Sequence, residues 1–237
     1  MYTTDQVAAT IDHAALKPNM TDRDIIEHAA LCAEHRVASF CVRPSDVPLA
    51  VRELAGTEVP VAVVAGFPHG ANHPETKALE ARLAIEDGAR EIDMVMNVGK
   101  FLSGDDDWVR KDVEGVVAEA KPQGVLVKVI LETCFLDDDE VVRACRLAEA
   151  AGADFVKTST GFGEDDKHSK SATPEVIDLM LNTVGGTMGV KASGGVRDWA
   201  TAVAYLDQGC KRLGAASTSA VLAGPSKKQG ETPSQAY

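Results

Sequence analysis

The sequence contains few aromatic residues and no long apolar run. Phe, Trp and Tyr make up 5% of its 237 residues. Apolar stretches such as Val61–Ala65 fall far short of the roughly 18 residues that a membrane-spanning helix needs. Residues 1–10 lack the basic start and the apolar stretch of a secretion signal. We therefore expect a cytoplasmic protein that does not contact a membrane.

Cysteine and positive charge are also scarce. The five cysteines form no Cys-x-x-Cys pair, and their odd number without an export signal argues against a disulfide framework. Asp and Glu outnumber Lys and Arg by 36 to 24, so the formal net charge is −12. Such a chain lacks the basic surface with which proteins bind nucleic acids. An anionic ligand would therefore need a local site.

Aliphatic residues and glycine are abundant and follow an alternating pattern. Hydrophobic residues account for 45% of the chain, which also has 20 glycines, and this composition favours an α/β protein. Short runs that are too apolar to be wet on either face recur about every 30 residues between longer segments of helical period. The expected strands are Ile11–Leu16, Ser39–Val42, Val61–Phe67, Glu91–Asn97, Val125–Glu132, Phe155–Ser159, Gly189–Ser193 and Arg212–Ala216.

The segments between these strands carry helix signals. Helices are expected to begin after Asp137 and Thr173, where early carboxylates suit the helix N-terminus. Leu79 and Leu83 predict an apolar helix face. A short helix over Thr4–Thr10 precedes the first strand.

Eight strand–helix units predict a (β/α)8 TIM barrel. An open doubly wound sheet would favour a glycine-rich turn after its first strand, and that turn is absent. The length suits a single domain over residues 1–237. Residues 224–237 have no apolar period and are expected to form a flexible tail.

Charged residues interrupt three of the expected strands. Asp93 lies in the fourth, Lys157 in the sixth and Lys191 in the seventh, and TIM barrels carry their reacting groups at the C-terminal ends of strands. Lys128 and Glu132 in the fifth strand rank lower, because they can offset charges on neighbouring strands. One lysine paired with Asp93 could be a purely structural ion pair. Two buried lysines near one carboxylate would leave a costly net charge unless it has a use.

That use would be a neutral lysine amine. Burial and a neighbouring ammonium both lower a lysine pKa, and a neutral amine can attack a carbonyl carbon to form an imine. Charge alone does not decide whether Lys157 or Lys191 is the nucleophile. The sequence therefore predicts carbon–carbon bond chemistry through a Schiff base.

A phosphate site is expected near the same strand ends. The loops after the seventh and eighth strands are the usual phosphate site of TIM barrels, and backbone amides there can bind an anion. The small polar turn that ends at Gly161 can also donate hydrogen bonds to a sugar or a phosphate. The candidate binding residues are Gly161, Ser193, Gly194, Gly195, Gly214 and Ser217.

No metal and no cofactor are expected. His69 and His73 are four residues apart, but Pro68, Gly70 and Pro74 place them in a loop. Two other functions remain open: a phosphosugar isomerase or synthase on the same fold, and a sensor without catalysis. An isomerase or synthase does not need two strand lysines around one aspartate, and a sensor would be expected to have lost Lys157, which is present.

Four segments resemble deoxyribose-phosphate aldolase, in order and over about residues 7–223. They are Ile11-Asp-His, Glu91-Ile-Asp-Met-Val-Met-Asn97, Phe155-Val-Lys-Thr-Ser-Thr-Gly161 and Val190-Lys-Ala-Ser-Gly-Gly-Val-Arg197. The resemblance implies a class I aldolase that reversibly joins acetaldehyde to D-glyceraldehyde 3-phosphate, giving 2-deoxy-D-ribose 5-phosphate, in deoxyribonucleoside catabolism. It implies that Lys157 forms the imine, that Lys191 perturbs Lys157, and that Asp93 relays protons through water.

The resemblance also implies supporting residues. Asp12 and Cys41 match pocket positions of the family, and Tyr237 matches a terminal tyrosine that assists proton transfer in some members. A homo-oligomer is expected, most simply a dimer, because barrels of this size often dimerise. Three positions depart from the pattern that the resemblance implies. Ala14 stands where members commonly have Thr, and Phe162 stands where some members have a basic residue. Ala216 stands where many members have the first of two serines. The stretch 163–170 is longer and more acidic than usual.

Overall fold

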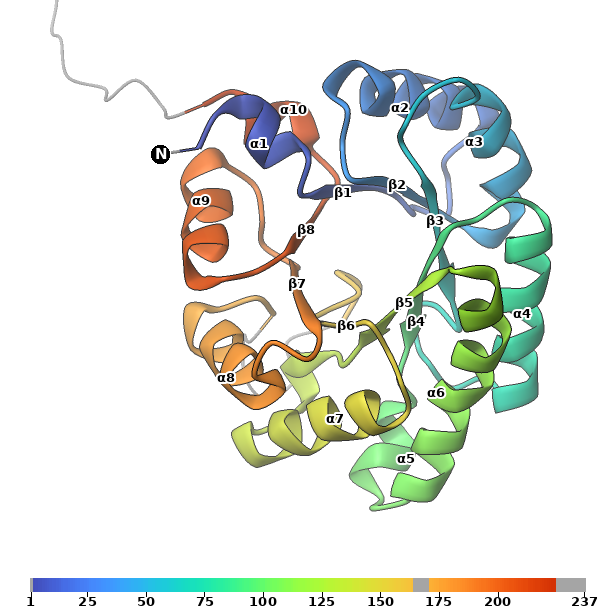
Figure 1. Cartoon of the computed structure of the whole chain (residues 1–237), viewed down its shortest axis with the longest axis vertical. Helices are drawn as coiled ribbons and strands as arrows, with labels where there is room; N and C mark the ends of the chain where they lie inside the picture. The colour runs from blue at the N-terminus through green and yellow to red at the C-terminus, as the bar shows by residue number, and fades with distance from the viewer. Residues whose placement is uncertain (1, 164–170, 225–237) are drawn as a thin grey trace, which may run out of the picture.

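Eight parallel strands close into a barrel, with β8 paired to β1 (Figure 1). The computed structural model describes residues 2–163 and 171–224. The strands are β1 Ile11–Ala15, β2 Ser39–Val42, β3 Val61–Ala65, β4 Glu91–Val95, β5 Leu126–Ile130, β6 Phe155–Lys157, β7 Gly189–Ser193 and β8 Arg212–Ala215. The prediction of a (β/α)8 barrel is confirmed.

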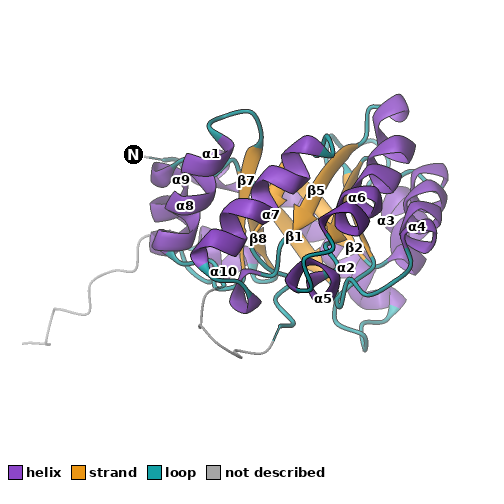
Figure 2. Cartoon of the chain, turned by 90° about the horizontal axis from the view of Figure 1, so that it is seen from below, coloured by secondary structure: helices purple, strands orange, loops and turns teal. Residues whose placement is uncertain are grey.

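Helices surround the barrel on its outside (Figures 1 and 2). Within the described ranges they are α1 Thr4–Ala8, α2 Asp22–His35, α3 Val47–Glu53, α4 Pro74–Glu86, α5 Val98–Leu102, α6 Asp106–Ala120, α7 Asp138–Ala150, α8 Pro174–Val184, α9 Trp199–Gln208 and α10 Thr218–Leu222. Short 3-10 turns cover Pro44–Asp46, Lys121–Gln123 and Thr133–Phe135. None of the helices in the described part of the chain is a candidate membrane span.

The observed helix starts agree with those expected from the sequence, whereas the end of the first helix and the ends of several strands do not. Asp137 caps α7 in a reciprocal pair with Glu140, and the Thr173 side chain caps α8. The N-terminal helix ends at Ala8, two residues before its expected end. Six expected strands run one or two residues too far, and in some of them the side chains just beyond the strand bond to neighbouring loops. Thr158, for example, donates to the Ser193 carbonyl at 2.6 Å.

The predicted apolar face of α4 is wrong. Leu79 and Leu83 are 43% and 49% exposed in this chain. Lys77 points inward in their place, where its ammonium donates to Asp112 at 2.5 Å and to the Val95 carbonyl at 2.8 Å. The hydrophobic period alone could not reveal this, because the buried partner of Lys77 comes from another helix.

The interior of the barrel has a polar side and an apolar side. Strand side chains alternate in direction, so one set packs under the helices and the other points inward. Cys41, Ala62 and Val64 form a small apolar cluster inside the barrel, against which Leu16 and Phe67 pack. On the other side, the strand register places charged residues opposite one another, with Asp93 beside Lys128 and Lys157 beside Lys191.

Candidate active site

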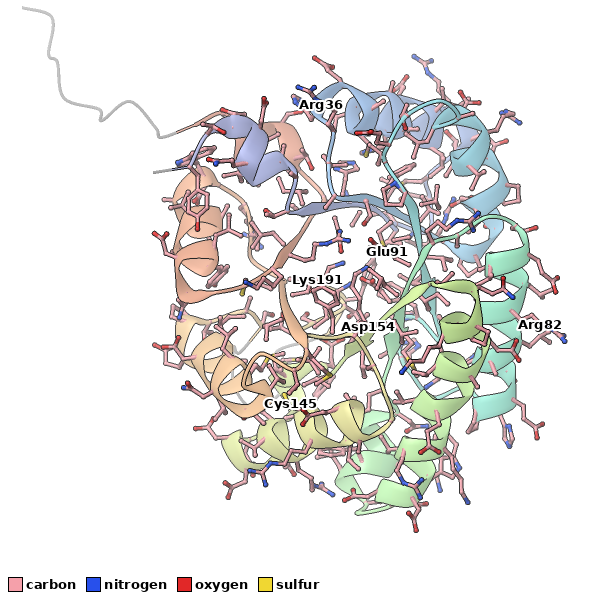
Figure 3. All side chains as sticks on the ribbon, in the orientation of Figure 1. Arg36, Arg82, Glu91, Cys145, Asp154 and Lys191 are labelled. Carbon is pink, nitrogen blue, oxygen red and sulfur yellow. The ribbon has the colours of Figure 1, made fainter. Side chains whose placement is uncertain are left out.

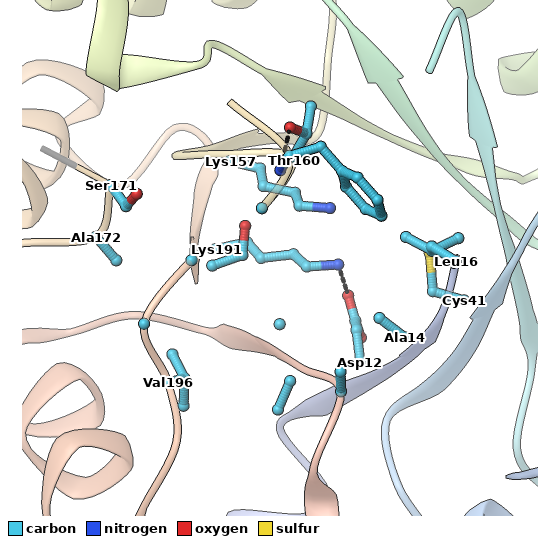
Figure 4. A pocket seen from close by; sticks show the side chains of 18 of the residues that line it. Asp12, Ala14, Leu16, Cys41, Lys157, Thr160, Ser171, Ala172, Lys191 and Val196 are labelled. Carbon is cyan, nitrogen blue, oxygen red and sulfur yellow. Dashed lines mark hydrogen bonds and ion pairs between the residues drawn. The ribbon is translucent and has the colours of Figure 1, made fainter. Parts of the chain in front are cut away.

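Asp93, Lys157 and Lys191 converge inside the barrel. The Nζ atoms of Lys157 and Lys191 each donate to Asp93 Oδ2 at 2.7 Å, and all three side chains are buried. In Figure 4 the two lysines extend side by side toward Asp12 and Cys41. The residues that the sequence singled out on three different strands thus form one cluster.

Lys128 completes the surroundings of Asp93. Its ammonium donates to Asp93 Oδ1 at 2.8 Å and to Glu91 at 2.6 Å, and lies 3.4 Å from Asp12. Lys191 also forms an ion pair with Asp12. The interpretation of Lys128 as a residue that offsets charge on neighbouring strands is confirmed by these contacts, and Asp12 belongs to the same network.

Glu91 and Arg212 lie at the first positions of β4 and β8 and extend the network toward the N-terminal ends of the strands. Arg212 forms ion pairs with both Asp12 and Glu91, and Figure 3 shows Glu91 and Lys191 pointing into the barrel. Apart from their position at the start of expected strands, no sequence signal marks them. The network, named here the barrel charge network, consists of Asp12, Glu91, Asp93, Lys128, Lys157, Lys191 and Arg212. Its three carboxylates balance its four cationic groups only if one lysine is neutral.

Electrostatics distinguishes the two lysines that the residues alone left equivalent. Burial lowers the pKa of Lys157, Asp93 opposes this effect, and the Lys191 ammonium lowers it further, so its pKa falls below the ordinary value. Burial also acts to lower the pKa of Lys191, but Asp12 and Asp93 outweigh it and the pKa is raised. Lys157 is therefore the better candidate for a neutral amine, and such an amine can attack a carbonyl carbon.

The carboxylates of the network are held in their charged form. Burial would raise the pKa of Asp93, but Lys128, Lys157 and Lys191 bring it well below its ordinary value. The same balance lowers the pKa of Asp12, through Lys128, Lys191 and Arg212. In the resting protein Asp93 is thus ionised. Burial raises the pKa of the nearby Cys41 thiol to about 11, so this cysteine is protonated at neutral pH.

A cavity of about 760 Å³ opens above the network. Lys157, Lys191 and Asp12 line its floor (Figure 4). Every residue that the sequence proposed for phosphate binding also lines it: Gly161, Ser193, Gly194, Gly195, Gly214 and Ser217. Candidate reacting groups and candidate binding groups therefore share one site.

The loop after β7 has a backbone that suits close approach of a ligand. Gly194 and Gly195 have φ angles of 83° and 115°, which other residues rarely adopt. The Ser193 hydroxyl donates to the Ser159 carbonyl at 2.5 Å, so it serves the loop structure. Gly214 faces Ser193 so closely that an added Cβ would lie 2.6 Å from the Ser193 Cβ. The absence of a side chain there keeps the floor of the cavity open.

Glu132 has a part in the site that its sequence position did not reveal. Its buried carboxylate accepts a bond of 2.5 Å from the Thr160 hydroxyl and also faces the Thr160 amide. Glu132 has a φ of 55°, a left-handed conformation that is uncommon outside glycine. Among the described residues Glu132 contacts the uncharged Thr160 and, at 3.9 Å, the Cys134 sulfur, so the expectation that it offsets charge on a neighbouring strand stays a prediction. It fixes the loop that follows Lys157.

The positions that depart from the family pattern also border the cavity. Ala14, Ala216 and Phe162 line it. Phe162 is 45% exposed and contacts Phe67 edge to face, with ring centroids 5.3 Å apart.

Of the acidic stretch 163–170 only Gly163 is described. Tyr237 and the expected tail after Gly224 also lie outside the described residues. Across the described ranges, no three His, Cys, Asp or Glu side chains gather as a metal-binding group.

Known proteins resemble this chain over most of its length. The model of the DeoC/LacD family aldolases matches residues 6–222. A deoxyribose-phosphate aldolase from Geobacillus sp. (strain WCH70) is 48% identical over 93% of this chain and 96% of its own length. One from Listeria innocua is 48% identical over 92% and 95%. The solved tetrameric deoxyribose phosphate aldolase from Aeropyrum pernix superposes with a TM-score of 0.85 at 31% identity, covering 93% of this chain and 91% of that one. Because the family model and these relatives span the charge network and the cavity loops alike, the chain belongs to the DeoC/LacD family of aldolases.

Proposed function

We propose that this chain is a class I aldolase that reversibly cleaves 2-deoxy-D-ribose 5-phosphate into D-glyceraldehyde 3-phosphate and acetaldehyde. The observation that carries the proposal is a buried lysine of lowered pKa, Lys157, on the floor of a cavity that is also lined by Gly161, Gly194, Gly195 and Gly214. The family and the names of the relatives support the same substrate.

In this mechanism the neutral amine of Lys157 attacks C1 of the open-chain sugar. Loss of water from the carbinolamine gives an iminium, which draws electrons from the C2–C3 bond. When a base removes the proton of the C3 hydroxyl, that bond breaks and D-glyceraldehyde 3-phosphate leaves. The remaining enamine takes up a proton at C2, and hydrolysis of the resulting iminium releases acetaldehyde and regenerates the amine.

The neighbours of Lys157 have separate parts in this sequence. Asp93 is the proposed acid and base, acting through a water molecule, since its carboxylate touches the Lys157 nitrogen and is ionised at rest. Lys191 is proposed to keep Lys157 neutral. Asp12 supports Lys191 through their ion pair. The assistance expected from Tyr237 stays a prediction.

The other end of the substrate is proposed to lie at the loops after β7 and β8. Backbone amides near Gly194, Gly195 and Ser217 would bind the phosphate. Gly161, in the loop after β6, would border the sugar. The cavity of about 760 Å³ has room for a five-carbon sugar phosphate.

Mass spectrometry after borohydride reduction with acetaldehyde tests the proposal. A Schiff base reduced in this way leaves one ethyl group on the lysine that formed it. We expect the ethyl group on Lys157. An ethyl group on Lys191 would show that Lys191, and not Lys157, forms the imine. An unmodified protein would exclude Schiff-base chemistry with this aldehyde.

Assembly and location are further parts of the proposal. We propose a homo-oligomer, most simply a dimer, because Ile26, Leu79 and Leu83 are apolar and exposed in the single chain. Sedimentation would measure its size. We also propose a cytoplasmic location, since all five cysteines are free thiols buried in the fold.

A further inference from the structure

Two positive side chains stand at the rim of the cavity without a charged partner. Lys17 and Arg197 both line it, and both are exposed. No ion pair joins either of them to another described residue. Among the described residues that line the cavity, Asp12 is the only one with a carboxylate, and it is buried and already paired with cations of the barrel charge network. The described part of the rim is therefore locally positive on a chain whose formal net charge is −12.

The backbone that carries Lys17 is held by one arginine. Arg43, just after β2, donates to the carbonyl oxygens of Lys17 at 3.0 Å, Pro18 at 3.2 Å and Met20 at 3.0 Å. Asp46 holds the guanidinium from the other side at 2.6 Å. A planar guanidinium with its donors in fixed directions suits such multiple bonding. The main chain of Lys17 is thus fixed, while its side chain stays free to reach a ligand.

The position of this loop favours contact with the phosphate end of the substrate. β1 pairs with β8, with Asp12 opposite Gly214, so the loop after β1 lies next to the loop after β8. That second loop contains Ser217, which lines the same cavity as Lys17. Figure 4 shows the start of this wall, where Ala14 in β1 and Leu16 just after β1 follow Asp12.

Phe162 supplies a second reason to look for a cation here. Phe162 contributes an uncharged aromatic ring that packs on Phe67. The loop after β6 therefore offers no charge at Phe162. A phosphate dianion still needs compensation beyond backbone amides, and a lysine ammonium is a suitable point charge.

We propose that Lys17 binds the phosphate group of the substrate and that Arg43 is the residue that positions it. This inference rests on the proposed function. Lys17 then selects phosphorylated over unphosphorylated sugars without taking part in the chemistry at Lys157. Arg43 acts only through the main chain of residues 17–20, because its donors are directed at carbonyl oxygens and at Asp46.

The test compares Lys17→Met with Lys211→Met on 2-deoxyribose 5-phosphate and on 2-deoxyribose. Lys211 is an exposed lysine immediately before β8, at the other end of the barrel, so its variant loses the same charge. For Lys17→Met we expect KM for the phosphorylated sugar to rise about tenfold, with kcat changed less than about twofold. Cleavage of 2-deoxyribose should stay the same, and Lys211→Met should behave as wild type with both sugars.

Two results would overturn the assignment of Lys17. One is an unchanged preference for the phosphorylated sugar in Lys17→Met. The other is an equal loss of that preference in Lys211→Met, which would show that the overall charge of the protein, and not a contact with Lys17, causes the loss. If wild type cleaves neither sugar, the proposed function itself fails. That result is distinct from a failure of Lys17 alone.

Combining the substitutions tests Arg43. Arg43→Met should reduce the preference for the phosphorylated sugar, and adding it to Lys17→Met should reduce that preference no further, because both changes remove the same contact. A preference that Arg43→Met leaves unchanged, or an additive loss in the double variant, would show that Arg43 does not act through Lys17.

Discussion

Replacing Lys191 by Met removes one ammonium from beside Lys157 while keeping a long side chain in the barrel. Both lysine nitrogens lie 2.7 Å from the same oxygen of Asp93. They are therefore at most about 5.4 Å apart, and at an effective dielectric constant of about 20 two such charges repel by about 3 kcal/mol. This repulsion is part of what keeps Lys157 neutral.

The sign of the effect follows from the charged form of lysine. The Lys191 ammonium lowers the pKa of Lys157, so its loss raises that pKa. Asp12 and Asp93 also lose a cation, which favours a charged Lys157 still more. At neutral pH about 3 kcal/mol corresponds to roughly a hundredfold smaller fraction of neutral amine. The loss should shrink as the pH rises, because alkaline solution restores the amine.

The assay is kcat/KM for sugar phosphate cleavage from roughly pH 6 to 10, with the yield of borohydride adduct measured at each pH. Thermal unfolding of the variant checks that the barrel remains folded. The acidic limb of the Lys191→Met profile should move to higher pH, in step with the adduct yield. A profile that coincides with wild type after scaling would refute the reasoning, since Lys191 would then act on something other than the protonation of Lys157.

Four other substitutions test individual contacts. Lys157→Leu should keep the fold by circular dichroism and lose at least about 99% of cleavage; activity on the order of a tenth of wild type would reject Lys157 as the nucleophile. Asp93→Asn should slow cleavage by about a hundredfold or more, and wild-type exchange of the acetaldehyde methyl protons with deuterated water would show that enamine formation does not need this carboxylate. Glu132→Gln should raise KM several-fold more than it lowers kcat, by loosening the Thr160 loop; steady-state kinetics showing a fall in kcat alone would contradict that. Tyr237→Phe should lower kcat without changing adduct formation at Lys157, and equal kcat values would remove the tyrosine from the mechanism.

The fold and the centre of the site follow from local patterns in the sequence. Alternating strands and helices determine a closed parallel barrel, and such a barrel brings the ends of its strands to one place. A charge inside an apolar strand therefore marks the site, and Asp93, Lys157 and Lys191 were all found in this way. Helix caps such as Asp137 are equally local, because the partner atoms lie within three residues.

Contacts between distant segments were not visible in the same patterns. Arg212 gains its importance from Asp12 and Glu91, which are 200 and 121 residues away along the chain. Leu79 is exposed on α4 against expectation and Lys77 is buried instead, because Asp112 on α6 gives the lysine a buried partner. A strand register or a helix contact of this kind depends on the whole fold, and no window of sequence contains it.

The barrel charge network has a consequence for the carbon chemistry as well. With a neutral Lys157 its three carboxylates match three cations, and formation of the iminium adds a fourth positive charge. The surroundings that disfavour the ammonium also disfavour the iminium, and the enamine removes that charge. The barrel should therefore strengthen the acidity of the carbon next to the imine. We expect the enamine to be the more populated covalent form, so an uncharged, planar mimic of the enamine should bind more tightly than a permanently cationic one.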